Sequence, residues 1–310
     1  AIYRSIFWVV KCDLVIKLYE KHIKLDKKVR YDQRCGNIVE KHNCFLNLLC
    51  SLINYALIVL TISILLSPFL IILISDNSLQ LPVPLYLIGI DIDTTHGFIL
   101  NYFFQVPATF LCVSVYQVIQ CLVVLFLGST AAQIEILRKK VRDFEHCILM
   151  NRSHKFIKGK LIHLIAEHNK ALEFAQGVES LLSFQLFLDV TSFSVAVVVS
   201  LFYALVGHWY PGYGMAFLIT TVGFLNHSLG ELVTIQNQKL SFEIYNNSWY
   251  LMDVKLQKMY LFFLKKSQKI HIFSCGGFRP IGLDLFAAFC NSIYSYFIIV
   301  NNLAGKYSNF

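Results

Sequence analysis

LINYALIVLTISILLSPFLIILIS, residues 52–75, runs for twenty-four residues without a charged side chain. A helix needs about 20 mostly apolar residues to cross the hydrocarbon core of a bilayer. Inside lipid, every backbone N–H and C=O group needs a partner within the protein, and a helix provides one for each residue. This stretch therefore predicts a transmembrane helix.

Four further segments have the same character, and they are residues 102–127, 181–206, 215–235 and 283–303. The whole chain is 56% hydrophobic and only 15% charged, whereas soluble domains carry about 25% charged residues. Residues 2–28 have the pattern of a span that ends and continues as a charged helix, while residues 255–272 are too short and too basic to cross a bilayer. The sequence thus predicts an all-α, polytopic helical membrane protein.

The basic residues lie on one side of these spans. Residues 1–51 contain ten Lys and Arg, residues 138–170 contain nine, and residues 239–279 contain seven. The intervening segments 76–101 and 207–214 contain none, and the C-terminal tail contains only Lys306. Because basic segments remain in the cytoplasm, we expect a multi-pass protein with its N-terminal segment inside the cell and its C-terminus outside.

This charge pattern predicts how the chain is organised. We expect 1–44 to be the end of a span and a cytoplasmic linker, 45–127 two spans with an outer loop, 128–180 cytoplasmic helices, 181–235 two further spans, 236–276 cytoplasmic helices, and 277–310 the last span and the outer C-terminus. Ile134, Leu137, Val141 and Phe144 recur at helical spacing, which is typical of a packed helix. The cytoplasmic helices should therefore form a bundle.

Motifs for catalysis are missing from the sequence. It contains no P-loop, no HExxH, no paired CxxC and no GxSxG, so we expect neither an enzyme nor a cofactor. The net charge of +8 is distributed between apolar spans rather than along one soluble face, which favours membrane lipid over nucleic acid as the surroundings. A G-protein-coupled receptor would carry DRY and NPxxY motifs and the opposite orientation. A transporter often contains internal repeats, and none is visible here.

The region 247–303, NSWYLMDVKLQKMYLFFLKKSQKIHIFSCGGFRPIGLDLFAAFCNSIYSYFIIVNNL, closely resembles the C-terminal signature of insect odorant receptors. The Trp249–Tyr250 pair, the basic KKSQK, the glycine-containing break, the LDLF entry and the YSYF of the last helix carry the resemblance. The Gly230–Glu231 step and AQIEILRKKV at 132–141 extend it over most of the chain. The resemblance implies a seven-span chemoreceptor fold with an inverted topology, from which the first span and most of the second are missing here.

Two related groups differ from this sequence. Gustatory receptors carry a TYxxxxxQF pattern in the last helix, where this chain has SYFIIVNNL; a gustatory-type receptor stays an alternative. The odorant co-receptor has a longer loop before the span that begins near Leu181. The resemblance therefore implies a ligand-tuning subunit rather than the co-receptor.

The resemblance also implies a function. Such receptors are odorant-gated, non-selective cation channels in the plasma membrane of olfactory sensory neurons, and they assemble with co-receptor subunits as tetramers that bind small volatile odorants. A metabotropic chemoreceptor linked to G proteins is the alternative from another class. The final helix lines the pore in this family, and the expected pore residues are Tyr296, Ile299, Asn302 and Leu303.

The family's ligand pocket lies in the outer half of the spanning bundle. Pockets for small ligands are mostly apolar and aromatic, with few polar groups. The candidates at that depth are Ser63, Ile64, Ser67, Ile71, Phe104, Ala108, Leu111, Cys112, Phe202, Tyr203, Phe217, Thr220, Thr221 and Phe224. For any one of them, ordinary helix packing is the competing interpretation, because Ser and Thr let helices approach closely.

Overall fold

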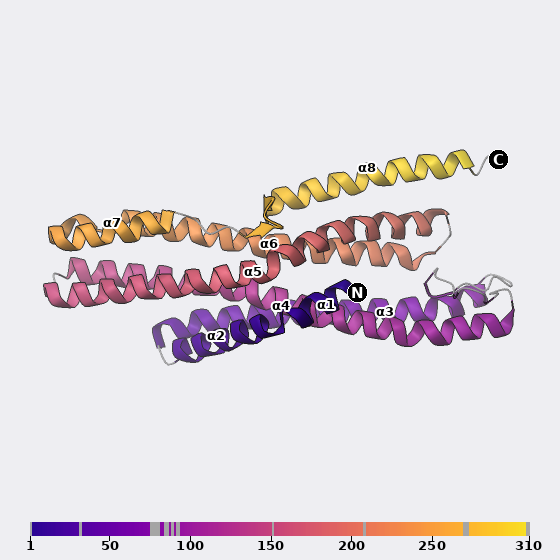
Figure 1. Ribbon diagram of the computed structural model, residues 1–310, viewed down its shortest axis with the longest axis horizontal. Helices are drawn as coiled ribbons and strands as arrows, with labels where there is room; N and C mark the ends of the chain where they lie inside the picture. The colour runs from indigo at the N-terminus through magenta and orange to yellow at the C-terminus, as the bar shows by residue number, and fades with distance from the viewer. Residues whose placement is uncertain are drawn as a thin grey trace.

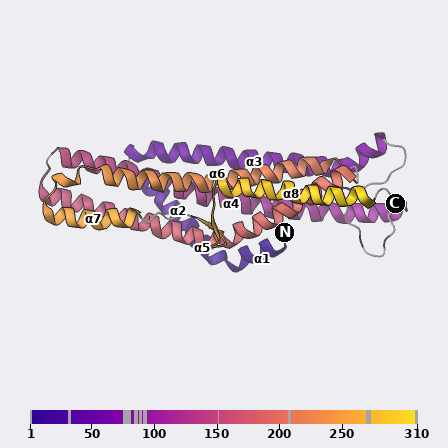
Figure 2. The same cartoon turned by 90° about the horizontal axis from the view of Figure 1, so that it is seen from above.

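Four long helices form the framework of the molecule. A computed structural model describes residues 2–30, 33–74, 81–83, 87, 90, 94–150, 152–206, 209–268 and 273–307. The long helices are α3 (Gln33–Ile74), α4 (Thr95–Leu149), α5 (His154–Val206) and α6 (Pro211–Asn246). They run along the long axis of the molecule as an elongated bundle (Figures 1 and 2).

The shorter elements attach to this framework. They are α1 (Ile2–Val10), α2 (Cys12–Arg30), the 3-10 helix η1 (Trp249–Leu251), α7 (Val254–Gln268), the strands β1 (Ser274–Cys275) and β2 (Arg279–Pro280), and α8 (Leu283–Tyr307). We call the end with the α4–α5 connection and α7 the basic end, and the end with the α3–α4 and α5–α6 connections the loop end. Helix α8 points towards the loop end (Figure 1).

The five predicted spans are confirmed. Helices of sufficient length and apolar character cover Cys35–Phe69, Thr95–Leu149, His154–Val206, Pro211–Leu251 and Leu283–Asn302. Some of them are far longer than a bilayer requires, since 53 to 55 residues of α4 and α5 extend for roughly 80 Å at about 1.5 Å per residue. The expected limits of the cytoplasmic segments, near residues 128, 181 and 236, therefore fall inside continuous helices, and these limits stay predictions.

The extended helices pack into a core at the basic end. Leu137, Val141 and Phe144 of α4 are at most 3% exposed, because helical spacing places them on one face. Phe144 stacks on Tyr260 of α7, with 6.2 Å between ring centroids. The periodic stripe predicted from the sequence is thus buried by α7 and its neighbours.

The Tyr260 hydroxyl is the polar centre of this core. The ring is fully buried, and its hydroxyl donates a hydrogen bond of 2.7 Å to the Ile244 carbonyl of α6. Tyr260→Phe should lower the free energy of unfolding by about 1–2 kcal/mol, because it leaves the buried carbonyl without this donor. Tyr250, which is 64% exposed, is the matched control, and Tyr250→Phe should cost less than about 0.5 kcal/mol. Thermal unfolding in detergent measures the loss of stability in both variants. Equal losses would contradict the role given to the Tyr260 hydroxyl.

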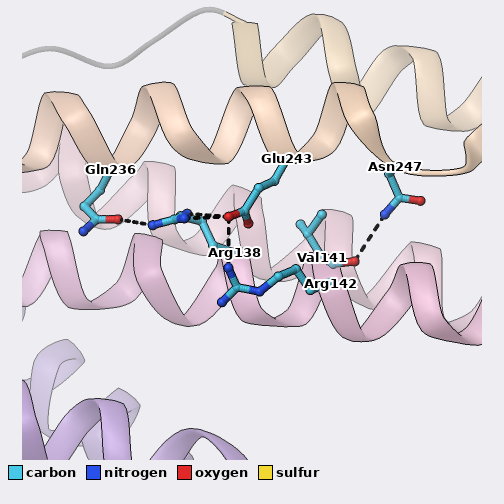
Figure 3. Close-up of polar contacts among 6 residues, drawn as sticks. All are labelled: Arg138, Val141, Arg142, Gln236, Glu243 and Asn247. Atoms are coloured by element: carbon cyan, nitrogen blue, oxygen red, sulfur yellow. Dashed lines mark hydrogen bonds and ion pairs between the residues drawn. The ribbon is translucent and has the colours of Figure 1, made fainter.

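An ion-pair cluster joins α4 to α6 next to this core (Figure 3). The Arg138 guanidinium donates to Glu243 Oε1 and, at 2.7 Å, to Gln236 Oε1. Arg142 donates to the same Glu243 oxygen at 3.0 Å. The side chains of Arg138 and Glu243 are only 15% and 19% exposed, whereas that of Arg142 is 55% exposed.

Polar pairs also hold the apolar segments together. Gln120 of α4 donates to Asn226 Oδ1 of α6 at 2.6 Å, and both residues are buried. Gln185 donates to Asp189 Oδ1 within α5 at 2.7 Å. Such side chains face other helices rather than lipid, and the Gln120–Asn226 pair fixes α4 against α6.

A short hairpin connects the basic end to α8. Ser274 pairs with Pro280 and Cys275 with Arg279, while Gly276 and Gly277 take the turn at φ values of 61° and 79°. These left-handed values favour glycine, which has no Cβ. The Gly276 N–H donates to the Ser183 carbonyl at 2.9 Å, so the hairpin is docked on α5. The sequence predicts a break here, but not the paired strands.

Candidate ligand-binding cavity

A cavity of about 560 Å³ lies near the loop end, among α3, α4, α5 and α6. Its wall on α4 follows a helical stripe through Asn101, Gln105, Ala108, Cys112 and Tyr116. The other lining residues are Leu57, Leu60, Thr61, Ile64, Val83, Leu87, Phe104, Thr109, Val113, Ser192, Phe193, Ala196, Trp209, Met215, Leu218 and Ile219. None of these side chains is charged, so the lining suits a neutral, largely apolar molecule.

The cavity's largest polar side chains hold the connection between α3 and α4. Gln105 both accepts from the Val83 N–H and donates to the Val83 carbonyl, each at 3.1 Å. Asn101 Oδ1 accepts from the Leu87 N–H at 2.8 Å. The Trp209 indole donates to the Pro82 carbonyl at 3.0 Å. These contacts fix the described parts of the connection beside the cavity.

Two hydroxyl groups of the lining donate hydrogen bonds to backbone carbonyls. Thr61 donates to the Leu57 carbonyl at 2.7 Å, and Ser192 donates to the Asp189 carbonyl at 3.3 Å. Each hydroxyl oxygen retains the capacity to accept a hydrogen bond. The lining can therefore bind an apolar body by contact area and orient it through a small number of weak polar contacts.

Four of the residues expected at the ligand site line this cavity, namely Ile64, Phe104, Ala108 and Cys112. Other expected residues point elsewhere. Leu111 and Phe217 are 68% and 75% exposed, and Tyr203 is 38% exposed. Ser63 is also exposed and donates to the Leu60 carbonyl.

The remaining expected residues make contacts within or between helices. Ser67 is buried and donates to the Ile64 carbonyl, while Thr220 and Thr221 donate to carbonyls one turn earlier in α6. Phe224 packs against Phe286 of α8 at 5.5 Å, and Phe202 packs against Tyr203 at 6.0 Å. The side chain of Ile71 lies outside the described residues.

The expected pore residues lie apart from the cavity. Tyr296 and Ile299 of α8 are 58% and 54% exposed, and Asn302 is exposed as well. The side chain of Leu303 lies outside the described residues. Among the described residues α8 contributes nothing to the lining, so the structure separates the two sets.

A sequence signal exists for the lining residues outside the expected set. Gln105 is a polar residue in an otherwise apolar run, and Asn101, Gln105, Thr109, Cys112 and Tyr116 follow one another at intervals of three or four residues. That spacing places them on one face of a helix. Trp209 is different, because its contact with Pro82 joins residues 127 positions apart, and no local pattern predicts such a contact.

The fold and cavity define a helical membrane protein with an uncharged cavity between its helices, and comparison with known proteins supplies the family. The model of the 7tm Odorant receptor family matches residues 1–294, and the chain belongs to this family. The chain is similar to Odorant receptor 10 of Aedes albopictus, with 21% identity over 72% of this chain and 60% of that receptor. It is also similar to Odorant receptor 30a of Drosophila melanogaster, with 24% identity over 59% of this chain and 48% of that receptor. The chain thus spans about half the length of these relatives.

Solved structures agree on the fold. The structure of the insect olfactory receptor OR5 from Machilis hrabei matches with a TM-score of 0.71 and 13% identity, covering 96% of this chain and 76% of that one. The structure of OR5 in complex with eugenol matches with a TM-score of 0.70 and 15% identity, covering 86% and 70%. The predicted insect chemoreceptor fold is therefore confirmed.

Proposed function

We propose that this chain is the odorant-binding subunit of a heteromeric, odorant-gated, non-selective cation channel in the plasma membrane of olfactory sensory neurons. The uncharged cavity of about 560 Å³ is the observation that carries the proposal. Its volume lies within the roughly 300–1,000 Å³ of typical small-molecule sites. A volatile ligand that buries about 200 Å² of apolar surface there gains roughly 5 kcal/mol. Micromolar affinity, about 8 kcal/mol, then needs one or two hydrogen bonds in addition.

The proposal includes sidedness. With the basic end in the cytoplasm, the cavity lies in the outer half of the spanning bundle and the C-terminus faces outwards. Residues 1–44, 128–180 and 236–276 then contain the cytoplasmic parts of the helices, and 45–127, 181–235 and 277–310 contain the spanning parts. The absence of Lys and Arg from residues 76–101 and 207–214 supports this orientation.

Exposed aromatic side chains at the basic end support assembly with co-receptor subunits in a tetramer. Phe242 and Tyr245 of α6 are 65% and 59% exposed, and Phe262 of α7 is 78% exposed. Large apolar side chains grouped on a surface outside lipid mark protein contacts. We propose that these residues form part of the subunit interface.

The exposed face of α8 supports a role in the pore. Tyr296, Ile299, Asn302 and Leu303 are the proposed pore residues, and Tyr296 and Ile299 are more than half exposed. In a tetramer the α8 helices of four subunits would surround the conduction path. Apolar and amide side chains there can close a pore by dewetting.

Filling the cavity tests the odorant site. Ala108→Phe adds a ring to a lining residue, so we expect the odorant concentration for half-maximal current to rise at least tenfold. Leu111→Phe places the same ring on the same helix at a residue that is 68% exposed, and it should leave the response within twofold. Currents are recorded in cells that co-express the co-receptor, and surface labelling corrects for expression. An unchanged response in Ala108→Phe would refute the cavity as the odorant site.

Recordings also separate a channel from a G-protein-linked receptor. Odorant-evoked current should persist in excised patches whose cytoplasmic face is bathed in GDP-β-S, because the proposed subunits form the pore themselves. Loss of the current under these conditions would favour the metabotropic alternative. The control is a co-expressed G-protein-coupled receptor, whose response the same treatment abolishes.

A further inference from the structure

A second cavity lies towards the basic end, and it shares no lining residue with the proposed odorant site. Its volume is about 60 Å³, and its lining includes His22 of α2, Asn43 of α3, Gln133 and Lys140 of α4, and Lys170 of α5. By the same measure, a cavity that holds one water molecule has a volume of about 10–15 Å³. The space therefore accommodates one small group, such as a phosphate, and not an acyl chain.

Only one of the two lysines that line this cavity has an ion-pair partner among the described residues. Lys140 pairs with Glu167 at 3.0 Å. Lys170 makes no ion pair with any residue that the structure describes. Two lysines face one carboxylate, so the lining carries an excess positive charge that favours an anion.

Gln133 provides an independent sign of a missing acceptor. Its Nε2 atom is buried and has no hydrogen-bond acceptor among the described residues. A buried N–H group without an acceptor is destabilising, and native structures contain few of them. An anionic oxygen in the cavity would satisfy this donor and pair with Lys170.

The cavity lies at the cytoplasmic surface of the bilayer in the proposed orientation. The apolar run of α4 ends at residue 127, so Ser129 at one end of the cavity lies near the hydrocarbon boundary and Lys140 lies roughly 16 Å further along the helix. Lys170 is at a similar distance from residue 181, where the apolar run of α5 begins. The headgroup region extends only about 5–8 Å beyond the hydrocarbon. The two lysines therefore lie deeper in the cytoplasm than the phosphodiester of an ordinary phospholipid.

Helix α2 adds positive charge beside the cavity. It contains Lys17, Lys21, Lys24, Lys27, Lys28 and Arg30 and only three acidic residues. Polybasic helices of this kind are attracted to an anionic cytoplasmic leaflet. This charge concentrates anionic lipid beside α2, whose His22 lines the cavity.

From these observations we propose that the cavity binds a phosphate carried on the projecting headgroup of an inner-leaflet phosphoinositide. A phosphate on the inositol ring reaches further from the bilayer than the phosphodiester does, which matches the depth of Lys140 and Lys170. Gln133 and Lys170 bind its oxygens, and Lys140 contributes charge while it remains paired with Glu167. The assignment of the leaflet rests on the sidedness of the proposed function, whereas the site itself does not depend on odorant binding.

The test uses the full receptor complex in nanodiscs that contain phosphatidylcholine and a photoactivatable phosphatidylinositol 4,5-bisphosphate. Labelled peptides are identified by mass spectrometry. We expect labelling of the peptides around Gln133 and Lys170 to fall at least fivefold in Lys170→Gln and at least twofold in Gln133→Leu. Lys155→Gln is the control, because Lys155 is exposed on the same helix and lies outside the cavity; its labelling should be unchanged.

Two further arms separate the possible outcomes. Soluble inositol 1,4,5-trisphosphate at 100-fold excess should reduce labelling less than twofold, because the bilayer holds the lipid at a high local concentration beside the site; a larger reduction would show a site for free phosphates and overturn the lipid as its occupant. Equal labelling in wild type, Lys170→Gln and Gln133→Leu would overturn the site itself. Gln133→Leu removes the buried donor at nearly constant volume, so it tests the site even if Lys170→Gln unfolds. Odorant sensitivity of Lys170→Gln should remain within twofold of wild type, so failure here is distinguishable from failure of the proposed function.

Discussion

Arg138→Met should lower the free energy of unfolding of the basic end by about 3–5 kcal/mol, because it leaves the carboxylate of Glu243 buried without its main cation. Arg138 donates to both Glu243 and Gln236, and its side chain is only 15% exposed (Figure 3). Thermal unfolding of the purified chain in detergent, followed by size-exclusion chromatography, measures the loss.

The same cluster contains its own control. Arg142 bonds the same Glu243 oxygen but is 55% exposed, and exposed ion pairs contribute about 0–1 kcal/mol. Arg142→Met should therefore cost less than about 1 kcal/mol. Combining Arg138→Met with Glu243→Leu removes both buried charges and should restore most of the lost stability. Equal costs for the two single arginine variants would show that burial does not determine the strength of this cluster.

Gly230→Leu should abolish odorant-evoked current and destabilise the chain by about 3 kcal/mol, the upper range for overpacked cores. A Cβ atom at Gly230 would lie 2.6 Å from Ile281 Cγ2 and 3.1 Å from the Ile281 carbonyl oxygen. Ile281 follows β2 and precedes α8 by two residues, so the added side chain must move the start of α8 away from α6. Current recordings and thermal unfolding report the two effects.

Alanine substitutions at two glycines provide the comparison. Gly230→Ala should destabilise by about 1–2 kcal/mol through the same contact. Gly159 lies in α5, and a Cβ atom added there would meet no atom within 4 Å, so Gly159→Ala should stabilise the helix by about 0.5–1 kcal/mol. If Gly230→Ala leaves both stability and current unchanged, the close approach of Ile281 does not restrict α8.

Local sequence patterns account for much of this fold. The uncharged runs identify the spans, and the stripe through Leu137, Val141 and Phe144 indicates that α4 continues beyond the lipid. The apolar pattern predicts a span that starts near Met215, but helix α6 begins earlier, at Pro211. Proline suits the first turn of a helix, where its missing N–H has no partner to lose.

Contacts between distant residues are what the sequence could not supply. Arg138 and Glu243 are 105 positions apart, and nothing in either helix alone identifies one as the partner of the other. The cavity residues divide in the same way, into those that a local pattern predicts and those that depend on distant contacts. Ala108 and Cys112 follow from depth and helical spacing, whereas the fixing of Val83 by Gln105 and of Pro82 by Trp209 depends on how the connection folds back.

The continuity of α4 has a mechanical consequence. From Ala108 at the first cavity to Leu149 at the far tip, the helix contains no proline and extends for roughly 62 Å. If this segment tilts as a unit about Ala108, one degree of tilt displaces Leu149 by about 1 Å. A small shift of the α4 wall at the first cavity would therefore produce a larger displacement of the end of α4 beside α7.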